Sequence, residues 1–262
     1  MTKLKVWQEE EWDKGIKAAA EKAPIKTLGK LPNMVGITPD TARFLTLKSL
    51  YWMVKKDKGF KILKSVLKKP FIHASRYFKS LLYPLKREGD FFFYGINSFD
   101  DFDRLLEKKP LLVVGFSYCH KPFECPSGRF TDQCIHDPEN PVCRQCFIGK
   151  AVNMLPEKDT VPLFIPTVHY IGEKMFELVE KHPDKQVAFI ITACEMTLTM
   201  FGDWGNLAGI KGLGVRLDGR ICNTMKAFEL SEEGIKPGLT VVLEPTKDKI
   251  IQLIKQWRSL VE

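Results

Sequence analysis

The sequence predicts an α/β protein with a Rossmann-like open, mostly parallel sheet and a helical N-terminal region. After about residue 105, short apolar runs alternate with amphipathic stretches, as they do in doubly wound sheets. Before that point, apolar residues recur mainly at the spacing of helices. We therefore expect a basic helical region over residues 1–105, followed by an α/β domain with a cysteine-rich metal-binding loop over residues 106–262.

The N-terminal elements are expected to be helices. One helix is predicted over residues 8–23. A second begins at Thr38, whose hydroxyl can cap a helix that opens with Pro39, and ends near residue 58. Two more, over residues 60–69 and 71–83, are separated by a proline.

The remaining elements alternate between strands and helices. Apolar runs predict buried strands at 111–116, 161–168, 187–192, 214–217 and 240–243. Amphipathic spacing predicts helices at 103–109, 173–181, 223–230 and 247–261, with Thr246 as the cap of the last. Gly209, Gly212 and Gly214 precede a strand, whereas a dinucleotide-binding loop follows one, so they predict a turn.

Length and composition are those of an ordinary globular protein. The 262 residues, 44% hydrophobic and 27% charged, are enough for a sizeable core in one large domain or two small ones. No apolar run approaches the roughly 20 residues of a membrane-spanning helix, so no transmembrane segment is expected. The first residues lack the apolar core of a secretory signal, which predicts a cytoplasmic protein.

Positive charge is concentrated in one segment. The formal net charge is +8, and residues 48–87 alone carry twelve basic side chains against one acid. Aromatic residues are interleaved with the lysines, which leaves three interpretations open. The segment is a solvated helix face with its aromatics packed inward, a nucleic-acid-binding patch, or an anionic membrane surface contact that makes the protein membrane-peripheral.

Five of the seven cysteines lie in one polar, proline-broken loop, at Cys119, Cys125, Cys134, Cys143 and Cys146. Buried cysteines are common core residues, but a loop with so few apolar neighbours has no core to fill. The spacing Cys143-x-x-Cys146 lets two thiolates hold one metal ion from a tight turn. An odd number of cysteines without a secretory signal favours free thiols over disulfides. The loop therefore predicts a metal or cluster site, with His120 and His136 as further candidate ligands.

The two remaining cysteines follow predicted strands. Cys194 and Cys222 lie just beyond two of them, and Cys119 lies just beyond the first. Ligands of open parallel sheets bind at the carboxyl ends of the strands, so these three thiols are expected to converge there. Alternatively, Asp218 and Gly219 turn a short hairpin that draws Cys222 back along the sheet. Taken singly, each thiol is also compatible with a buried structural role.

Four motifs in residues 110–240 resemble the family catalogued as domain of unknown function 116. In order they read F-S-Y-C-H-x4-C-P, C-R-Q-C-F-I-G, V-A-F-I-I-T-A-C-E and G-V-R-L-D-G-R-I-C-N-T. The chain departs from that family in the spacing of its loop cysteines and in its long basic N-terminal region. The resemblance implies a site and no reaction. Its motif positions are Cys119, Cys125, Cys143, Cys146, Cys194, Glu195, Cys222, Asn223 and Thr224.

The cysteines are numerous enough for two centres. Cys125, Cys134, Cys143 and Cys146 permit a closed four-cysteine site, and Cys119, Cys194 and Cys222 permit a second centre with an open position. We expect an iron–sulfur cluster, with zinc as the alternative, and an unidentified small-molecule substrate. Asn223 and Thr224 are expected beside the cofactor and Glu195 as a proton donor or acceptor. The competing interpretation is a non-enzymatic, zinc-stabilised module that binds nucleic acid or an anionic membrane through its basic helices.

Overall fold

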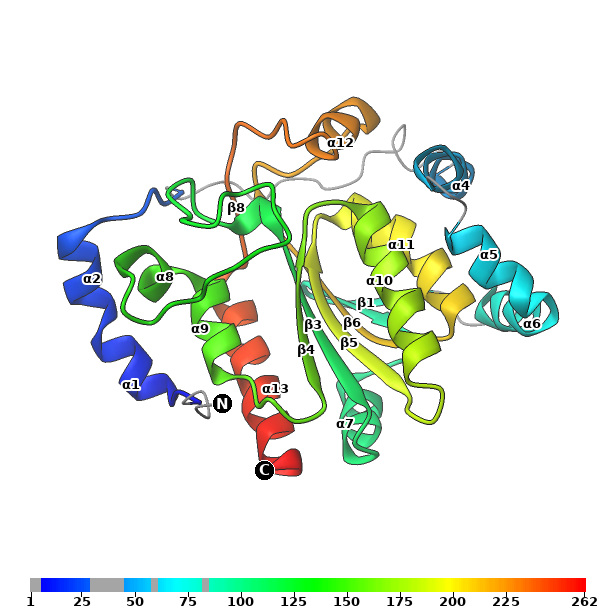
Figure 1. Cartoon of the computed structure of the whole chain (residues 1–262), viewed down its shortest axis with the longest axis horizontal. Helices are drawn as coiled ribbons and strands as arrows, with labels where there is room; N and C mark the ends of the chain where they lie inside the picture. The colour runs from blue at the N-terminus through cyan, green and yellow to red at the C-terminus, as the bar shows by residue number, and fades with distance from the viewer. Residues whose placement is uncertain (1–5, 29–44, 58–60, 82–84) are drawn as a thin grey trace.

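The structure, a computed structural model, describes residues 6–28, 45–57, 61–81 and 85–262. A six-stranded sheet forms its middle layer, and helices cover both faces (Figure 1). The α/β class and the mostly parallel sheet are confirmed. The predicted helix start at Thr38 lies outside the described residues.

The sheet has the strand order β1-β2-β6-β5-β3-β4. Strands β3, β4, β5 and β6 are parallel to one another, and β1 and β2 add an antiparallel edge beside β6. The strands are β1 Lys86–Glu88, β2 Phe91–Tyr94, β3 Leu111–Ser117, β4 Thr160–Ile165, β5 Val187–Ala193 and β6 Lys211–Arg216. Within the sheet, β4 lies on one side of β3, whereas β5 and then β6 lie on its other side. The chain therefore changes direction at the carboxyl ends of β3 and β5, where open α/β sheets form their ligand crevice.

Alternation along the central strands supplies two hydrophobic layers. Leu111 and Val113 of β3 belong to the core beneath α10 (Val168–Lys181) and α11 (Glu195–Ala208). Leu112 and Val114 face α7 (Phe99–Glu107), α9 (Phe147–Met154) and α13 (Glu244–Val261). Each fully buried side chain of this size contributes about 1.5–3 kcal/mol. Burial on both faces explains why these strands read as continuous apolar runs in the sequence.

The N-terminal helices lie on two opposite sides of the molecule (Figure 1). Helices α1 (Glu9–Lys14) and α2 (Ile16–Lys22) pack beside the cysteine loop and its short helix α8 (Pro141–Gln145). The basic helices α4 (Leu45–Lys56), α5 (Lys61–Lys68) and α6 (Pro70–Leu81) pack against α10 and α11.

Two strands occur where only helices were expected. Strand β2 consists of four consecutive buried aromatic residues, and β1 pairs with it through a turn at Gly89. A run of only four aromatics cannot be told from a buried helix segment by periodicity, which explains why its sequence did not predict a strand. The sheet therefore extends to the N-terminal side of residue 105, the expected domain boundary.

Other differences concern the C-terminal third. The stretch 240–243 was expected in the parallel sheet, but β8 (Thr240–Val241) instead pairs antiparallel with β7 (Asp218–Gly219) in a separate two-stranded sheet. Helix α13 begins at Glu244, and Thr246 donates a 2.8 Å hydrogen bond to Asp90 instead of capping the helix. Gly212 and Gly214 lie within β6, where a β-carbon at Gly212 would stand 2.1 Å from the Phe189 carbonyl oxygen. These two permit close strand packing, and of the three glycines only Gly209, the left-handed C-cap of α11, lies in the predicted turn.

Candidate functional site

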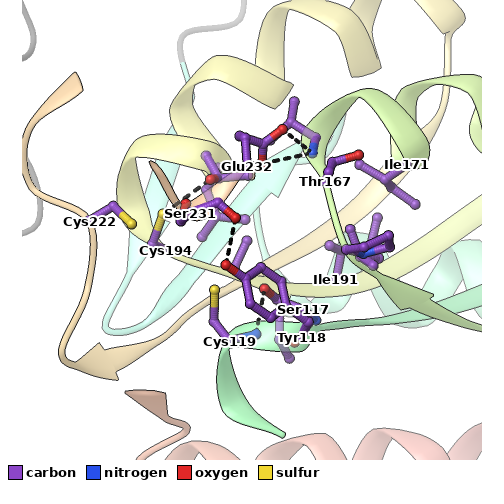
Figure 2. A pocket seen from close by; sticks show the side chains of 17 residues that line it. Ser117, Tyr118, Cys119, Thr167, Ile171, Ile191, Cys194, Cys222, Ser231 and Glu232 are labelled. Atoms are coloured by element: carbon purple, nitrogen blue, oxygen red, sulfur yellow. Dashed lines mark hydrogen bonds between the residues drawn. The ribbon is translucent and has the colours of Figure 1, made fainter. Parts of the chain in front are cut away.

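Three cysteines from distant parts of the sequence line one cavity at the strand ends (Figure 2). Cys119 lies in the 3₁₀ turn Tyr118–His120 that follows β3, and Cys194 is the residue before α11. Cys222 lies between β7 and α12 (Met225–Ser231), so the short hairpin does not draw it away. The cavity measures about 30 Å³, which is room for one or two groups the size of water.

Two of these sulfurs form a hydrogen-bonded pair. The Cys194 thiol is hydrogen-bonded to the Cys222 sulfur and lies 3.1 Å from the Thr197 hydroxyl oxygen. Lys236 Nζ donates to Cys222 Sγ at 3.2 Å. The hydrogen bond from Cys194 and the charge of Lys236 lower the pKa of Cys222, despite its burial. The hydrogen bond to Cys222 and burial raise the pKa of Cys194, and burial raises the pKa of Cys119.

A buried carboxyl group lines the same cavity. Both oxygens of Glu232 accept from the Val168 backbone N–H, at 3.1 and 3.0 Å, at the start of α10. Burial raises the pKa of Glu232 to about 8. Its neighbour Ser231 accepts a 2.6 Å hydrogen bond from the Tyr118 hydroxyl through its carbonyl. Sequence reasoning missed Glu232, because nothing in its local pattern distinguishes it from a surface acid.

The other four cysteines gather in the loop. They line a second cavity of about 10 Å³ and are Cys125, Cys134, Cys143 and Cys146. Backbone N–H groups donate to three of the sulfurs: His136 to Cys134, Asp137 to Cys143, and both Ile148 and Gly149 to Cys146. Burial raises the pKa of Cys143 to about 11 and that of Cys146 to about 12. All seven cysteines of the chain are free thiols.

Lys121 is buried beside this group of thiols. Its side chain is 1% exposed, and Nζ donates to the carbonyls of Gly128, Thr131 and Gln133 at 3.3, 3.0 and 2.7 Å. Burial lowers the pKa of Lys121, whereas the loop thiols, Cys125 foremost, act in the opposite direction. A buried ammonium favours anionic neighbours, so Lys121 favours thiolates in the loop.

The N-terminal helices brace the Cys143-x-x-Cys146 turn. The Arg144 guanidinium lies over the rings of both Trp7 and Trp12, 4.4 and 4.6 Å from their centroids. Arg144 Nε donates to the Trp12 carbonyl, and Trp12 Nε1 donates to the Arg144 carbonyl, both at 3.0 Å. Gly149 permits the next turn, because a β-carbon there would lie 2.2 Å from the Cys143 carbonyl oxygen.

The four loop sulfurs are gathered more loosely than a bound ion requires. A tetrahedral zinc with 2.3 Å bonds places its sulfurs about 3.8 Å apart. Within the part of the chain that the structure describes, no three cysteine sulfurs all lie within 4.8 Å of one another. Metal binding in the loop would therefore draw the sulfurs together.

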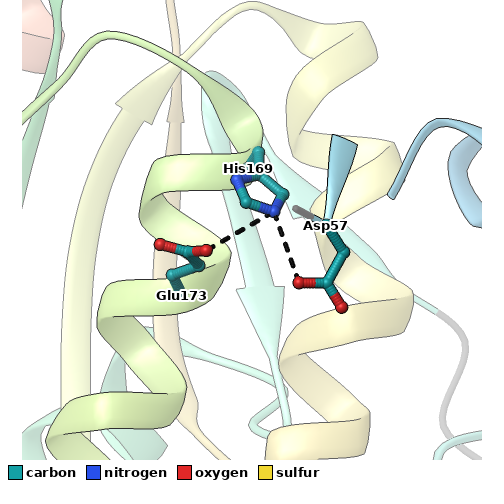
Figure 3. A group of neighbouring side chains, drawn as sticks. All are labelled: Asp57, His169 and Glu173. Carbon is teal, nitrogen blue, oxygen red and sulfur yellow. Dashed lines mark ion pairs between the residues drawn. The ribbon is translucent and has the colours of Figure 1, made fainter. Parts of the chain in front are cut away.

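Potential ligand atoms of Asp57, His169 and Glu173 do lie within 4.8 Å of one another (Figure 3). His169 Nε2 lies 3.8 Å from Asp57 and 3.7 Å from Glu173. The same carboxylates already have protein partners, because Asp57 accepts from the Leu63 backbone at the start of α5 and Glu173 pairs with Lys61 at 3.3 Å. We infer that these ion pairs hold the basic helices against α10.

The remaining predicted site residues lie outside the strand-end cavity. Glu195 forms ion pairs with Arg87 and Arg216, at 3.1 and 3.3 Å, and does not line the cavity of the three cysteines. Thr224 caps α12 by accepting from the Ala227 backbone, and Asn223 precedes it. The loop histidines contact protein groups: His120 Nε2 lies 3.2 Å from the Thr192 hydroxyl, and His136 Nδ1 lies 2.9 Å from the Cys134 carbonyl.

Comparisons with known proteins found no relative. No protein-family model, no curated protein and no solved structure matches the chain. The resemblance to domain of unknown function 116 therefore stays a prediction. In the described ranges, no helix combines the length and the apolar character that crossing a membrane requires.

Proposed function

We propose that this chain is a cysteine-ligated metal protein, in which the loop holds one metal ion beside a small-molecule pocket at the strand ends. The observation that carries the proposal is the division of the seven cysteines between two cavities that share none of them. The loop group, Cys125, Cys134, Cys143 and Cys146, is the proposed metal site. Seven free thiols also suit a reducing compartment, so we propose a cytoplasmic location.

Zinc is the proposed occupant of the loop. Four thiolates without an open position are the usual ligand set of a structural zinc, and the cavity of about 10 Å³ suits a single ion. The backbone N–H groups and Lys121 offset part of the charge that four thiolates carry. An iron–sulfur cluster, expected from the number of cysteines, is the alternative and needs more space for its additional iron and sulfide atoms.

At the strand ends, the charged and polar groups around Cys222 favour a small-molecule ligand over a second metal ion. Lys236 already places a cation 3.2 Å from Cys222, where a metal ion would have to bind. The cavity also contains hydroxyl groups and the Glu232 carboxyl, which suit a small polar ligand.

Metal analysis of anaerobically purified protein tests the loop proposal. We expect colourless protein with about one zinc per chain, and loss of that zinc in Cys143→Ser and in Cys146→Ser. Cys222→Ser, a thiol replacement in the other cavity, is the matched control and should keep its zinc. Iron with labile sulfide would support the cluster instead. Full zinc content in both loop variants would reject the proposed site.

The basic helices support a second proposal, docking on an anionic membrane surface. Tyr51, Leu67, Phe71 and Phe78 are 66%, 62%, 88% and 66% exposed, although the solvated-face interpretation expects such residues to pack inward. Lysines lie among them on α4, α5 and α6. Exposed apolar side chains beside basic ones suit the interface of an anionic bilayer, whereas a nucleic-acid backbone needs mainly the charge.

Vesicle sedimentation tests this docking. We expect binding to phosphatidylcholine vesicles only when phosphatidylglycerol is included, and weaker binding as salt rises. Lys64→Glu/Lys69→Glu and, separately, Phe71→Ser should each weaken binding roughly tenfold. Lys108→Glu/Lys158→Glu reverses two exposed charges elsewhere and should bind normally. Binding to single-stranded DNA but not to vesicles would indicate that the basic helices bind nucleic acid and not a membrane. Binding to neither would refute both the membrane and the nucleic-acid proposals.

A further inference from the structure

Beyond metal binding and docking, we propose that Cys222 and Cys194 form a reactive dithiol that a small hydroperoxide oxidises to a disulfide. The proposal stands on three groups that line one cavity, the paired sulfurs, the Thr197 hydroxyl and the Glu232 carboxyl, and on the Lys236 ammonium, which contacts Cys222. It does not depend on which metal the loop binds.

Cys222 is placed as the nucleophile. Lys236 Nζ lies 3.2 Å from its sulfur, and the Cys194 thiol is hydrogen-bonded to it, so both neighbours stabilise the thiolate. The lowered pKa of Cys222 agrees with this geometry. Burial lowers the pKa of Lys236, but the neighbouring cysteines, Cys119 and Cys222 foremost, raise it. The ammonium and the sulfur of Cys222 therefore stabilise each other's charged form.

Cys194 is placed as the resolving thiol. It lies at the start of α11, within hydrogen-bond reach of the sulfur that reacts first. A second thiol at that distance converts a sulfenic acid to a disulfide faster than further oxidation can proceed. The Thr197 hydroxyl, 3.1 Å from the Cys194 sulfur, positions it.

The cavity limits the substrate to a very small oxidant. Cys194 and Cys222 are 7% and 3% exposed, and the space beside them is about 30 Å³. A protein disulfide cannot reach sulfurs buried in this way, whereas hydrogen peroxide is only slightly larger than water. Half-buried polar residues at the cavity, Ser117, Thr167 and Thr197, suit a hydrogen-bonding oxidant.

The chemistry balances as a two-electron oxidation of the dithiol. The Cys222 thiolate attacks one peroxide oxygen, the O–O bond breaks, and the departing hydroxide takes a proton to become water. Cys222 is then a sulfenic acid. The Cys194 sulfur attacks the Cys222 sulfur, an S–S bond forms, and the sulfenic oxygen leaves as water with the proton of Cys194. Glu232, protonated near neutral pH, holds a proton at the same cavity for the first step.

The test is peroxide treatment of the purified protein with its bound metal, followed by peptide mapping of its thiols. We expect a Cys194–Cys222 disulfide that dithiothreitol reduces. In Cys194→Ser, dimedone should label a sulfenic acid at Cys222. In Lys236→Met, oxidation should slow by roughly tenfold, since the thiolate is less populated when its cation is removed. Cys119→Ser alters a third thiol of the cavity and should still form the disulfide.

Two results would overturn the proposal. One is a pair that stays reduced in the wild type while the loop cysteines become oxidised. The other is Cys222 oxidation at an unchanged rate in Lys236→Met. Zinc content measured in the same samples separates these results from a failure of the loop site, because Cys194→Ser and Lys236→Met should both retain the metal.

Discussion

Lysine side chains accompany both groups of thiols. Lys121 is enclosed beside the loop cysteines, and the half-buried Lys236 contacts Cys222. A cation in a poorly solvated position favours the ionised form of its neighbours, and the thiolate is the form that both binds metal and acts as a nucleophile. At each site a lysine therefore contributes to the electrostatic condition for the proposed chemistry.

Glu232 gives a prediction about pH and stability. Burial raises its pKa from 4.5 to about 8 in the folded chain. Its contribution to stability is complete below pH 4.5 and is lost as pH rises towards 8, because the unfolded chain ionises more easily. We expect the wild type to lose on the order of a few kcal/mol over this range relative to Glu232→Gln. Urea unfolding of both proteins at several pH values measures the difference, and parallel pH profiles would contradict it.

At the scale of elements, the N-terminal pair α1–α2 supports the cysteine loop. Lys150 of α9 pairs with Glu9 and Asp13 of α1, each at 2.8 Å, close to the rings that cover Arg144. Helix α1 therefore contacts the chain at Arg144, within the turn that carries Cys143 and Cys146, and again at Lys150, just beyond that turn. A metal site on such a turn depends on a helix pair that contributes no ligand to it.

We predict that Trp12→Ala weakens the metal site as well as the fold. Removal of this fully buried ring should cost about 3–5 kcal/mol of stability. It also uncovers Arg144, so zinc should transfer to a chromogenic chelator faster than from the wild type. Trp257→Phe, a substitution of a buried tryptophan that hydrogen-bonds to Thr160 and not to the loop turn, should leave the transfer rate unchanged. Equal rates in Trp12→Ala and the wild type would show that the brace is dispensable.

Local hydrophobicity was sufficient to predict the strands that form long apolar runs. β3 and β5 are the clearest of these, and they are buried on both faces. β2 and β8 depend on their partners β6 and β7, and no local pattern encodes that pairing. The convergence of Cys119, Cys194 and Cys222 followed from strand order, whereas Glu232 and Lys236 gain their roles only through tertiary contacts.

At the scale of the whole molecule, the sheet joins the two regions that the sequence separated. β2 pairs with β6 across the expected boundary near residue 105, and Trp52 of α4 belongs to the core that contains Phe189 of β5. Regions that share a sheet and a core are expected to unfold together.

We therefore predict a single unfolding transition. Three of the five tryptophans lie before residue 105 and two after it, so fluorescence reports on both regions. In guanidinium, the fluorescence and far-ultraviolet circular dichroism curves should coincide. An early fluorescence transition that leaves most of the helical signal intact would instead support two independent domains.

The contact between Trp12 and Arg144 joins residues 132 positions apart in the chain. At about 5–20 residues per second, the ribosome adds Arg144 roughly 7–26 s after Trp12. For that time the N-terminal helices exist without the loop that they brace. Cys143 and Cys146 are added together with Arg144, so the loop can pack against the N-terminal helices and bind the metal in the same interval of synthesis.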